Sequence, residues 1–487
     1  MLSKFAGKSF LYTLGAVVTR GVAFFLLPLY TLYLSPADYG VLSLSATFTT
    51  VLGMLLAFSL ESAVILFYFQ LEAQEYRNFL RTIWLYLSLA PLLGVGVLLL
   101  LGPLVSPSLF PSVPWNPYLW LAVWIAYTNI LTTIPLALLR AQQRAAEYVC
   151  FTLAMFAVTT GLTIYFVVLR GEGARGSLQG QLLSGIVMAA ISYWIVVRYC
   201  LPGGGTWFYH RHLGSALRFC LPFMPHILCI WVLNLSDRWI LGHYVALGEV
   251  GIYNLSYTMG SVLGVLGWGL ICAYEPLYYQ SHKDSSLRAQ LPRMLTGYML
   301  VMTWVTLALS LLALEALKLV AQPAFFGAAK LVPWIAVGFW CFAGLYPVAM
   351  LAVEYHRRTK WNVFISGPAA LVNVGLNWLL IPRYGVLAAA LTTLAGFAVM
   401  TALALRFSHT LERLAMPWAA LAQMVVVAAL AYLIGTTWLS LPDPGLAILA
   451  KGALLLLAGV SMAYLGGFRL DNMRSLLSVR RIQEAIR

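Results

Sequence analysis

The amino-acid sequence predicts an all-α polytopic membrane protein with two similar lobes, and three observations support this fold class. Of the 487 residues, 61% are hydrophobic and only 9% are charged, with a mean hydropathy of +0.85. About a quarter of the residues in an ordinary soluble domain are charged. Apolar runs of roughly 20 residues, long enough to cross a bilayer as helices, recur along the whole chain. A phrase from the first half of the chain also returns in the second half.

We predict about 14 transmembrane helices, one from each long apolar run. The longest polar connection between them covers residues 198–218, so no loop is long enough to fold into a soluble catalytic domain. The predicted spans are 11–33, 40–67, 82–105, 117–139, 150–169, 178–197, 219–241, 250–274, 294–316, 331–353, 362–381, 385–405, 417–438 and 446–466.

The distribution of Lys and Arg predicts the orientation, because cytoplasmic loops of membrane proteins are enriched in cations. With both termini in the cytoplasm, 22 of the 30 Lys and Arg residues fall in cytoplasmic segments and six fall outside. Only Arg20 and Arg238 fall within spans. The net charge of +14 therefore reflects topology. Because these cations are scattered over many short loops, nucleic acid is not an expected partner.

The internal repeat predicts how the spans are grouped. Residues 40–53 and 251–264 are nearly the same phrase, 211 positions apart, and share Gly40/Gly251 and Gly53/Gly264. A second match, at an offset of 209, pairs residues 176–178 with 385–387. A nearly constant offset across six spans predicts two parallel six-helix lobes. We expect these lobes at 1–212 and 213–412, followed by two extra helices and a cytoplasmic tail at 413–487.

Arg20 lies about nine residues into the first predicted span. A cation at that depth costs a few kcal/mol, so its side chain should face protein or water. One interpretation is an internal ion pair, for example with Glu61. The other is capture of an anionic headgroup, since a guanidinium stays charged and binds phosphate oxygens in a bidentate manner.

The seventh predicted span holds His226, Asp237 and Arg238. Adjacent residues do not face each other on a helix. Asp237 and Arg238 could instead bond across to other spans, as a structural latch, or serve the transported substrate. His226 could either titrate near neutral pH or serve as a hydrogen-bonded interior residue.

Rows of polar residues at helical spacing occur in three spans. The residues are Ser43, Thr47, Thr50 and Glu61 in the second span, Asn254, Thr258 and Ser261 in the eighth, and Asn362, Ser366, Asn373 and Asn377 in the eleventh. Such groups can bond their own helix or a neighbouring helix, which is a packing role. Their occurrence at matching positions of both repeats instead favours a hydrated interior.

The sequence contains no catalytic or cofactor-binding pattern. Its six cysteines show no metal-ligand spacing, and no Ser–His–Asp set, paired carboxylates or phosphate-binding glycine loop is present. We therefore expect no enzyme activity, no metal and no cofactor. Glu275, Glu315 and Glu354 lie near span ends, where a carboxylate is easily solvated or can snorkel to the interface.

Four stretches of the chain resemble one known family. They are Leu34–Val41, Leu60–Ala63, Leu235–Leu241 followed by Glu249–Leu255, and Asn373–Val386. In order and at similar spacing, they resemble the polysaccharide-transport branch of the MOP flippase superfamily. This branch comprises Wzx-type lipid-linked oligosaccharide flippases, which are related to MurJ-type lipid II flippases and MATE exporters. The resemblance covers about residues 10–410.

The resemblance implies two six-helix bundles around a cavity that opens to alternate leaflets, with basic residues for a pyrophosphate and extra C-terminal helices forming a groove for a prenyl tail. It implies flipping of an undecaprenyl-pyrophosphate-linked oligosaccharide to the outer leaflet of the bacterial inner membrane. Membrane lipids and polysaccharide polymerase or assembly proteins are the implied partners. The alternative is an ion-coupled, MATE-like exporter, although the first span lacks the acid linked to cation coupling there. The candidate cavity residues are Arg20, Glu61, His226, Asp237, Arg238, Asn373 and Asn377.

Overall fold

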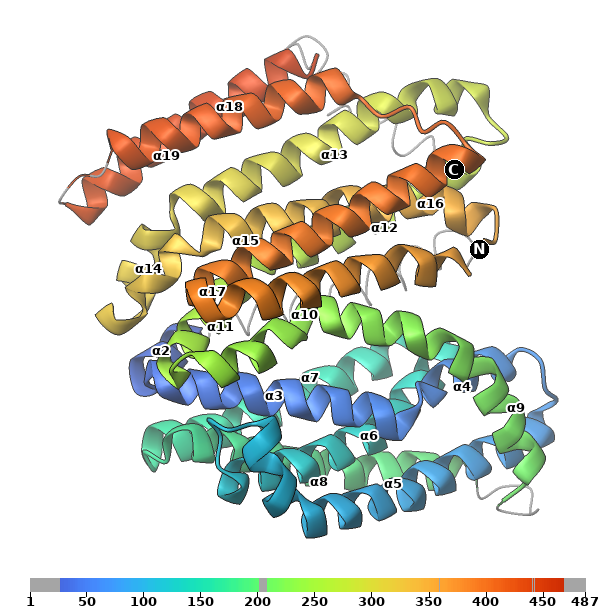
Figure 1. The fold of residues 1–487 in the computed structure, drawn as a ribbon. Coiled ribbons are helices and arrows are strands. Elements are labelled where there is room, and N and C mark those ends of the chain that lie inside the picture. The colour runs from blue at the N-terminus through green and yellow to red at the C-terminus, as the bar shows by residue number, and fades with distance from the viewer. Residues whose placement is uncertain (1–26, 201–207, 359, 440, 442, 468–487) are drawn as a thin grey trace. The chain divides into compact units, whose positions relative to one another are not determined.

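The computed structural model describes residues 27–467 apart from 201–207, 359, 440 and 442, and the regular structure in this part of the chain is all helical (Figure 1). The predicted all-α class is confirmed. The chain forms two compact units, one ending at Gly251 and the other beginning at Ile252. The predicted lobe boundary at 212/213 and the parallel relation of the lobes stay predictions.

The first unit consists of helices long enough to cross a bilayer, together with shorter connecting helices. They are α2 (Leu27–Tyr33), α3 (Pro36–Ala57), α4 (Leu60–Tyr68), α5 (Ala73–Leu109), α6 (Trp120–Ala141), α7 (Ala145–Ile164), α8 (Gly173–Cys200), α9 (His210–Cys220), α10 (Met224–Tyr244) and the start of α11 (Leu247–Gly260). π-helical turns at Trp115–Leu119 and Tyr165–Leu169 extend α6 and α7, and a 3₁₀ turn at Leu221–Phe223 joins α9 to α10.

The second unit continues from α11 and holds the C-terminal helices. They are α12 (Val262–Gln280), α13 (Ser285–Leu311), α14 (Ala313–Val320), α15 (Val332–Phe339), α16 (Tyr346–Tyr355), α17 (Trp361–Leu411), α18 (Trp418–Thr437) and α19 (Pro444–Leu465). A 3₁₀ segment at Pro323–Lys330 precedes α15, and a π-helical segment at Trp340–Leu345 joins α15 to α16.

The predicted spans agree with the observed helices. Twelve described helical stretches are long and apolar enough to cross a membrane. The 51-residue α17 holds two predicted spans, because its backbone turns at Gly385 (φ 56°, ψ −137°). A hydrogen bond from Asn373 to the carbonyl oxygen of Thr392 joins the two arms. Each predicted span from 40–67 onward therefore coincides with helix, whereas most of the span 11–33 lies outside the described residues.

The span predicted at 40–67 is interrupted between α3 and α4. Phe58 (φ 50°) and Ser59 (φ 52°) are both in the left-handed region, which non-glycine residues seldom adopt. The α3 helix begins with a capping box, in which Ser35 accepts from the backbone N–H of Asp38 and Asp38 accepts in return. A second oxygen of Asp38 accepts from the backbone N–H of Ala174 at 3.0 Å, which connects the first turns of α3 and α8.

Two glycines of the sequence repeat lie against each other within the first unit. A Cβ atom on Gly40 would overlap the carbonyl oxygen of Leu247, and one on Gly251 would overlap the carbonyl oxygen of Pro36. Only glycine allows the backbones of α3 and α11 to approach this closely. The repeated Gly53 is different, because a Cβ atom there would meet open space.

Each unit has its own apolar core. In the first unit, α4, α5 and α6 share a cluster of fully buried side chains with the ends of α8 and α9, including Leu60, Leu80 and Ile134. In the second unit, α18 and α19 pack on each other and on α13 (Figure 1). The indole of Trp304 on α13 donates to the carbonyl oxygen of Leu455 on α19 at 2.9 Å.

Candidate functional site

An apolar groove in the second unit is the clearest candidate for binding a lipid chain. It has a cavity volume of about 310 Å³ and is lined by residues of α13, α15, α18 and the segment after α15. Trp334, Trp340 and Tyr432 form aromatic walls, and the small Ala428 and Ala429 leave space on the α18 side. One wall therefore comes from the pair of helices that the internal repeat does not include.

Several polar side chains at this groove form hydrogen bonds within the protein. Thr306 donates to the carbonyl oxygen of Met302, and Ser310 donates to that of Thr306, both at 2.7 Å. The indole of Trp340 donates to the hydroxyl of Thr303 at 3.0 Å. Because these groups bond to the protein, the groove presents a mainly apolar surface that suits an alkyl or isoprenoid chain.

A buried ion pair connects this helix pair to the rest of the second unit. Lys451 on α19 donates to Glu315 on α14 at 2.6 Å and to the carbonyl oxygen of Leu311 at 3.3 Å. Lys451 is 5% exposed and Glu315 is 4% exposed. The prediction of a solvated Glu315 is wrong, because α19 covers this carboxylate and supplies its counter-ion.

Asn373 and Asn377 lie in a buried hydrogen-bond network that joins the arms of α17. Asn377 donates to the side chain of Asn373 at 3.1 Å, and Asn373 donates to the carbonyl oxygen of Thr392 at 3.0 Å. The hydroxyl of Thr392 bonds to Asn377 and to the carbonyl oxygen of Ala389. These contacts correspond to the predicted packing role, and a role in a cavity stays a prediction.

Asp237 and Arg238 are buried in α10, where they bond to each other. The guanidinium of Arg238 lies 3.1 Å from the carboxylate of Asp237 and donates to the carbonyl oxygen of Asn234 at 2.5 Å. The prediction that these neighbours do not pair is wrong. The long Arg238 side chain folds back along its own helix and reaches both acceptors, which the spacing of Cβ atoms alone does not anticipate.

The other candidate residues lie in different places. Arg20 is outside the described residues. Glu61 is half-buried in the first turn of α4, directly after the break at Phe58 and Ser59, where a carboxylate favourably meets the positive end of the helix dipole. His226 is half-buried in the first turn of α10. Their roles in substrate binding stay predictions.

The two polar rows in the second and eighth spans largely bond their own helices. Thr47 donates to the carbonyl oxygen of Ser43 at 2.9 Å, and Thr258 donates to that of Asn254 at 2.9 Å. Thr50 likewise donates to the carbonyl oxygen of Ala46 at 2.7 Å. These contacts match the packing interpretation of the rows.

A charged cluster around Glu412 was missed by sequence reasoning. The carboxylate accepts from Tyr278 at 3.0 Å, from His282 at 2.9 Å and from Arg288 at 2.9 Å. Burial alone would raise the pKa of Glu412, but the hydrogen bonds from His282 and Tyr278 and the charges of His282 and Arg288 bring it below its usual value. No sequence motif predicts this cluster, because Tyr278, His282 and Arg288 all lie more than 120 positions from Glu412 in the chain.

Comparison with known proteins identifies the family. The chain matches the family model described as a polysaccharide biosynthesis protein over residues 5–269, more than half of its length. A curated relative, the Lsg locus putative protein 1 of Haemophilus influenzae, is 21% identical over 290 residues, which cover 58% of this chain and 68% of the relative.

Solved structures with a similar fold include a flippase and a transporter. The lipid II flippase MurJ in an inward closed conformation superposes with a TM-score of 0.76 at 14% identity, covering 93% of this chain and 98% of that chain. An inward-facing multidrug resistance MATE family transporter of the MOP superfamily superposes with a TM-score of 0.60 at 11% identity, covering 80% and 94%. At such identities the likeness establishes the fold.

These comparisons agree with the multi-pass helical structure described above. The two solved structures are described as a flippase and a transporter, and the family model as a polysaccharide biosynthesis protein. The chain belongs to the polysaccharide biosynthesis protein family.

Proposed function

We propose that this protein flips an undecaprenyl-pyrophosphate-linked oligosaccharide from the cytoplasmic to the outer leaflet of the bacterial inner membrane by alternating access. The observation that carries this proposal is the apolar groove formed by α13, α15 and α18. A long isoprenoid tail needs a hydrocarbon-like path, whereas the sugar and pyrophosphate need polar protein groups. Family membership and the MurJ-like fold support the same substrate class.

The groove supplies a direct test. Ala429 is exposed on α18 and lines the groove, so Ala429→Trp would fill part of the space for the tail. Ala422 is also exposed on α18 and does not line the groove, which makes Ala422→Trp a matched control. We expect Ala429→Trp to stop surface polysaccharide assembly in a deletion strain and to leave the lipid-linked precursor facing the cytoplasm, whereas Ala422→Trp complements.

The headgroup is tested separately at Arg20. We expect Arg20→Ala to stop surface polysaccharide assembly while the protein still inserts, because a neutral side chain cannot bind the pyrophosphate. Normal polysaccharide in this variant would remove Arg20 from the proposed site.

Both termini are proposed to be cytoplasmic. Accessibility labelling of single-cysteine variants at each end tests that orientation.

The MATE-like fold similarity makes an ion-coupled exporter of small amphipathic compounds the competing function. The deletion strain separates the two proposals. Loss of surface polysaccharide with unchanged drug sensitivity supports the flippase. Altered drug resistance with intact polysaccharide would reject it in favour of the exporter.

A further inference from the structure

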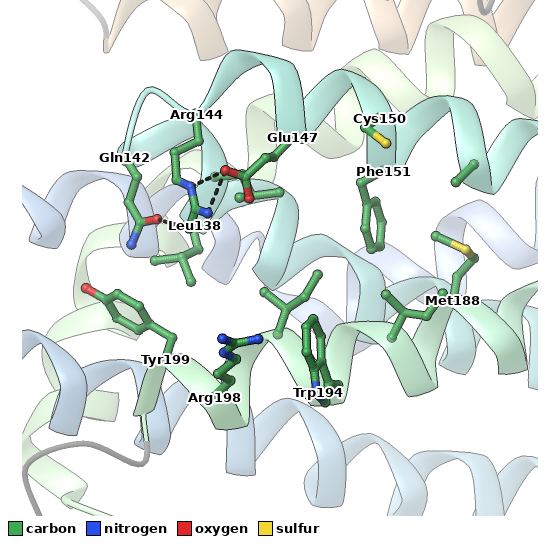
Figure 2. A pocket seen from close by; sticks show the side chains of 14 residues that line it. Leu138, Gln142, Arg144, Glu147, Cys150, Phe151, Met188, Trp194, Arg198 and Tyr199 are labelled. Atoms are coloured by element: carbon green, nitrogen blue, oxygen red, sulfur yellow. Dashed lines mark hydrogen bonds and ion pairs between the residues drawn. The ribbon is translucent and has the colours of Figure 1, made fainter.

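A second pocket lies in the first unit, between α7 and α8 and beside the end of α6, with a cavity volume of about 700 Å³. One part of its lining is apolar and includes Phe151, Met188 and Ile195. The polar residues come from the start of α7 and the end of α8 and so gather at one end of the helix pair. Figure 2 shows Arg144 on one side of the pocket and Arg198 on the opposite side.

The charges at the polar end do not balance. Arg144 donates to Glu147 at 2.6 Å, so this cation has a carboxylate partner. The guanidinium of Arg198 instead lies over the indole ring of Trp194, 5.2 Å from its centroid. Among the described residues, no ion pair involves Arg198. The pocket therefore carries one uncompensated positive charge.

The stacking on Trp194 prepares Arg198 to bind an anion. Trp194 and Arg198 are four residues apart on α8, so their side chains share one helical face. A guanidinium that stacks on an aromatic ring still presents its N–H groups at the edge, in a geometry that matches phosphate oxygens. The apolar wall beside it suits a hydrocarbon chain.

The pocket lies on a helix that is little covered by the protein. In the apolar stretch of Ala145–Leu169, which contains α7, only 11% is buried inside the protein. This is the lowest share among the twelve candidate spans of the described residues. In the predicted orientation, residues 142–147 and 198–218 lie on the cytoplasmic side, where anionic headgroups of the inner leaflet attract basic residues. A lipid could enter from the bilayer without passing through the protein.

We propose that this pocket binds an anionic phospholipid of the cytoplasmic leaflet, with the phosphate on Arg198 and an acyl chain along Phe151 and Met188. The volume of about 700 Å³ lies within the roughly 300–1,000 Å³ typical of small-molecule binding pockets, enough for a headgroup phosphate and part of an acyl chain. The site is separate from the groove proposed for the transported lipid and does not depend on that function.

Lipid binding to the purified full-length protein tests the proposal. Native mass spectrometry would titrate phosphatidylglycerol, which is anionic, against phosphatidylethanolamine, which has no net charge. We expect tighter binding of phosphatidylglycerol, and we expect Arg198→Gln to weaken it roughly tenfold, since a charge-assisted contact is lost. Arg406→Gln is the matched control, because Arg406 is an exposed arginine near the end of α17 that lines neither the pocket nor the groove.

A second variant separates the pocket from simple surface attraction. Ala154 is exposed and lines the pocket, so Ala154→Trp would fill it while leaving both arginines in place. We expect this variant to lose phosphatidylglycerol binding, whereas Ala422→Trp retains it. If Ala154→Trp does not fold, as judged by thermal unfolding, Arg198→Gln decides the question.

Inorganic phosphate distinguishes a lipid site from a plain anion site. We expect millimolar inorganic phosphate alone to leave the unfolding temperature unchanged, because it cannot use the apolar wall. Equal stabilisation by phosphate and by phosphatidylglycerol would overturn the lipid assignment. Unchanged binding in Arg198→Gln, or equal binding of both lipids, would also overturn the proposal.

Discussion

Lys451 and Glu315 form a buried ion pair that joins α19 to α14, with 2.6 Å between the ammonium nitrogen and the carboxylate oxygen. The second carboxylate oxygen of Glu315 has no hydrogen-bond partner among the described residues. A buried charge is tolerated only when it is paired. This contact therefore fixes α19, the helix against which the groove-lining α18 packs.

Breaking this pair from one side should be costly. We expect Lys451→Met to lower the free energy of unfolding by about 3–5 kcal/mol, because Glu315 is left as an uncompensated buried charge. The double variant Lys451→Met/Glu315→Leu should recover most of this loss, since neither charge remains. Denaturant unfolding of the purified protein measures both effects. Equal instability of the single and double variants would contradict a role for the ion pair.

The repeated glycines provide a second prediction. Gly40→Ala and Gly251→Ala should each lower the free energy of unfolding by about 1–3 kcal/mol or prevent insertion, because the new methyl group meets a backbone carbonyl that cannot move aside. Gly53→Ala should be tolerated, since it has open space around it. Expression and thermal unfolding of the three variants decide the matter, and equal behaviour would show that the close approach is unimportant.

Much of the fold could be predicted from hydropathy, because spacing and length decide whether a segment can cross a bilayer. The break at Phe58 and Ser59 could not be predicted, since neither glycine nor proline marks it. The Gly40 and Gly251 match in the sequence reflects a real packing requirement.

The candidate site was harder to predict than the fold. Side-chain pairs such as Lys451 with Glu315 join positions that are 136 residues apart and belong to no motif. The pairing of Asp237 with Arg238 depends on the conformation of one long side chain. Helical spacing gives the direction of a Cβ atom, but it does not give the path of a guanidinium.

The cluster around Glu412 predicts a pH dependence of stability. The pKa of this carboxyl is lowered in the folded protein, so its contribution is fully present above the usual Glu value of 4.5 and is lost as the pH falls through the lower folded pKa. Charged or titratable groups facing it are Tyr278, His282, Arg288 and His356.

We expect Glu412→Gln to be less stable than the original protein at pH 7, with the difference shrinking as the pH falls below 4.5. Glu72→Gln is the control, because Glu72 is exposed and has no ion pair among the described residues. Thermal unfolding across this pH range measures the difference. A stability difference that does not change with pH would show that the charge of Glu412 is unimportant.

The last prediction concerns backbone strain at Ser59, which adopts φ 52° and ψ 32° between α3 and α4. A non-glycine residue in this region costs about 1–2 kcal/mol, and glycine does not bear that cost. Ser59→Gly should therefore stabilise the broken form by about 1 kcal/mol, whereas Ser59→Val should destabilise it because a β-branched side chain clashes in this conformation. The Ser59 carbonyl that accepts from the Cys220 thiol at 3.4 Å is retained in both variants. If both variants were equally stable, the strained conformation would not be the one that the protein maintains.

Transport assays on Ser59→Gly then show whether the backbone between α3 and α4 must straighten during the transport cycle. A variant that favours the broken form would slow such a step.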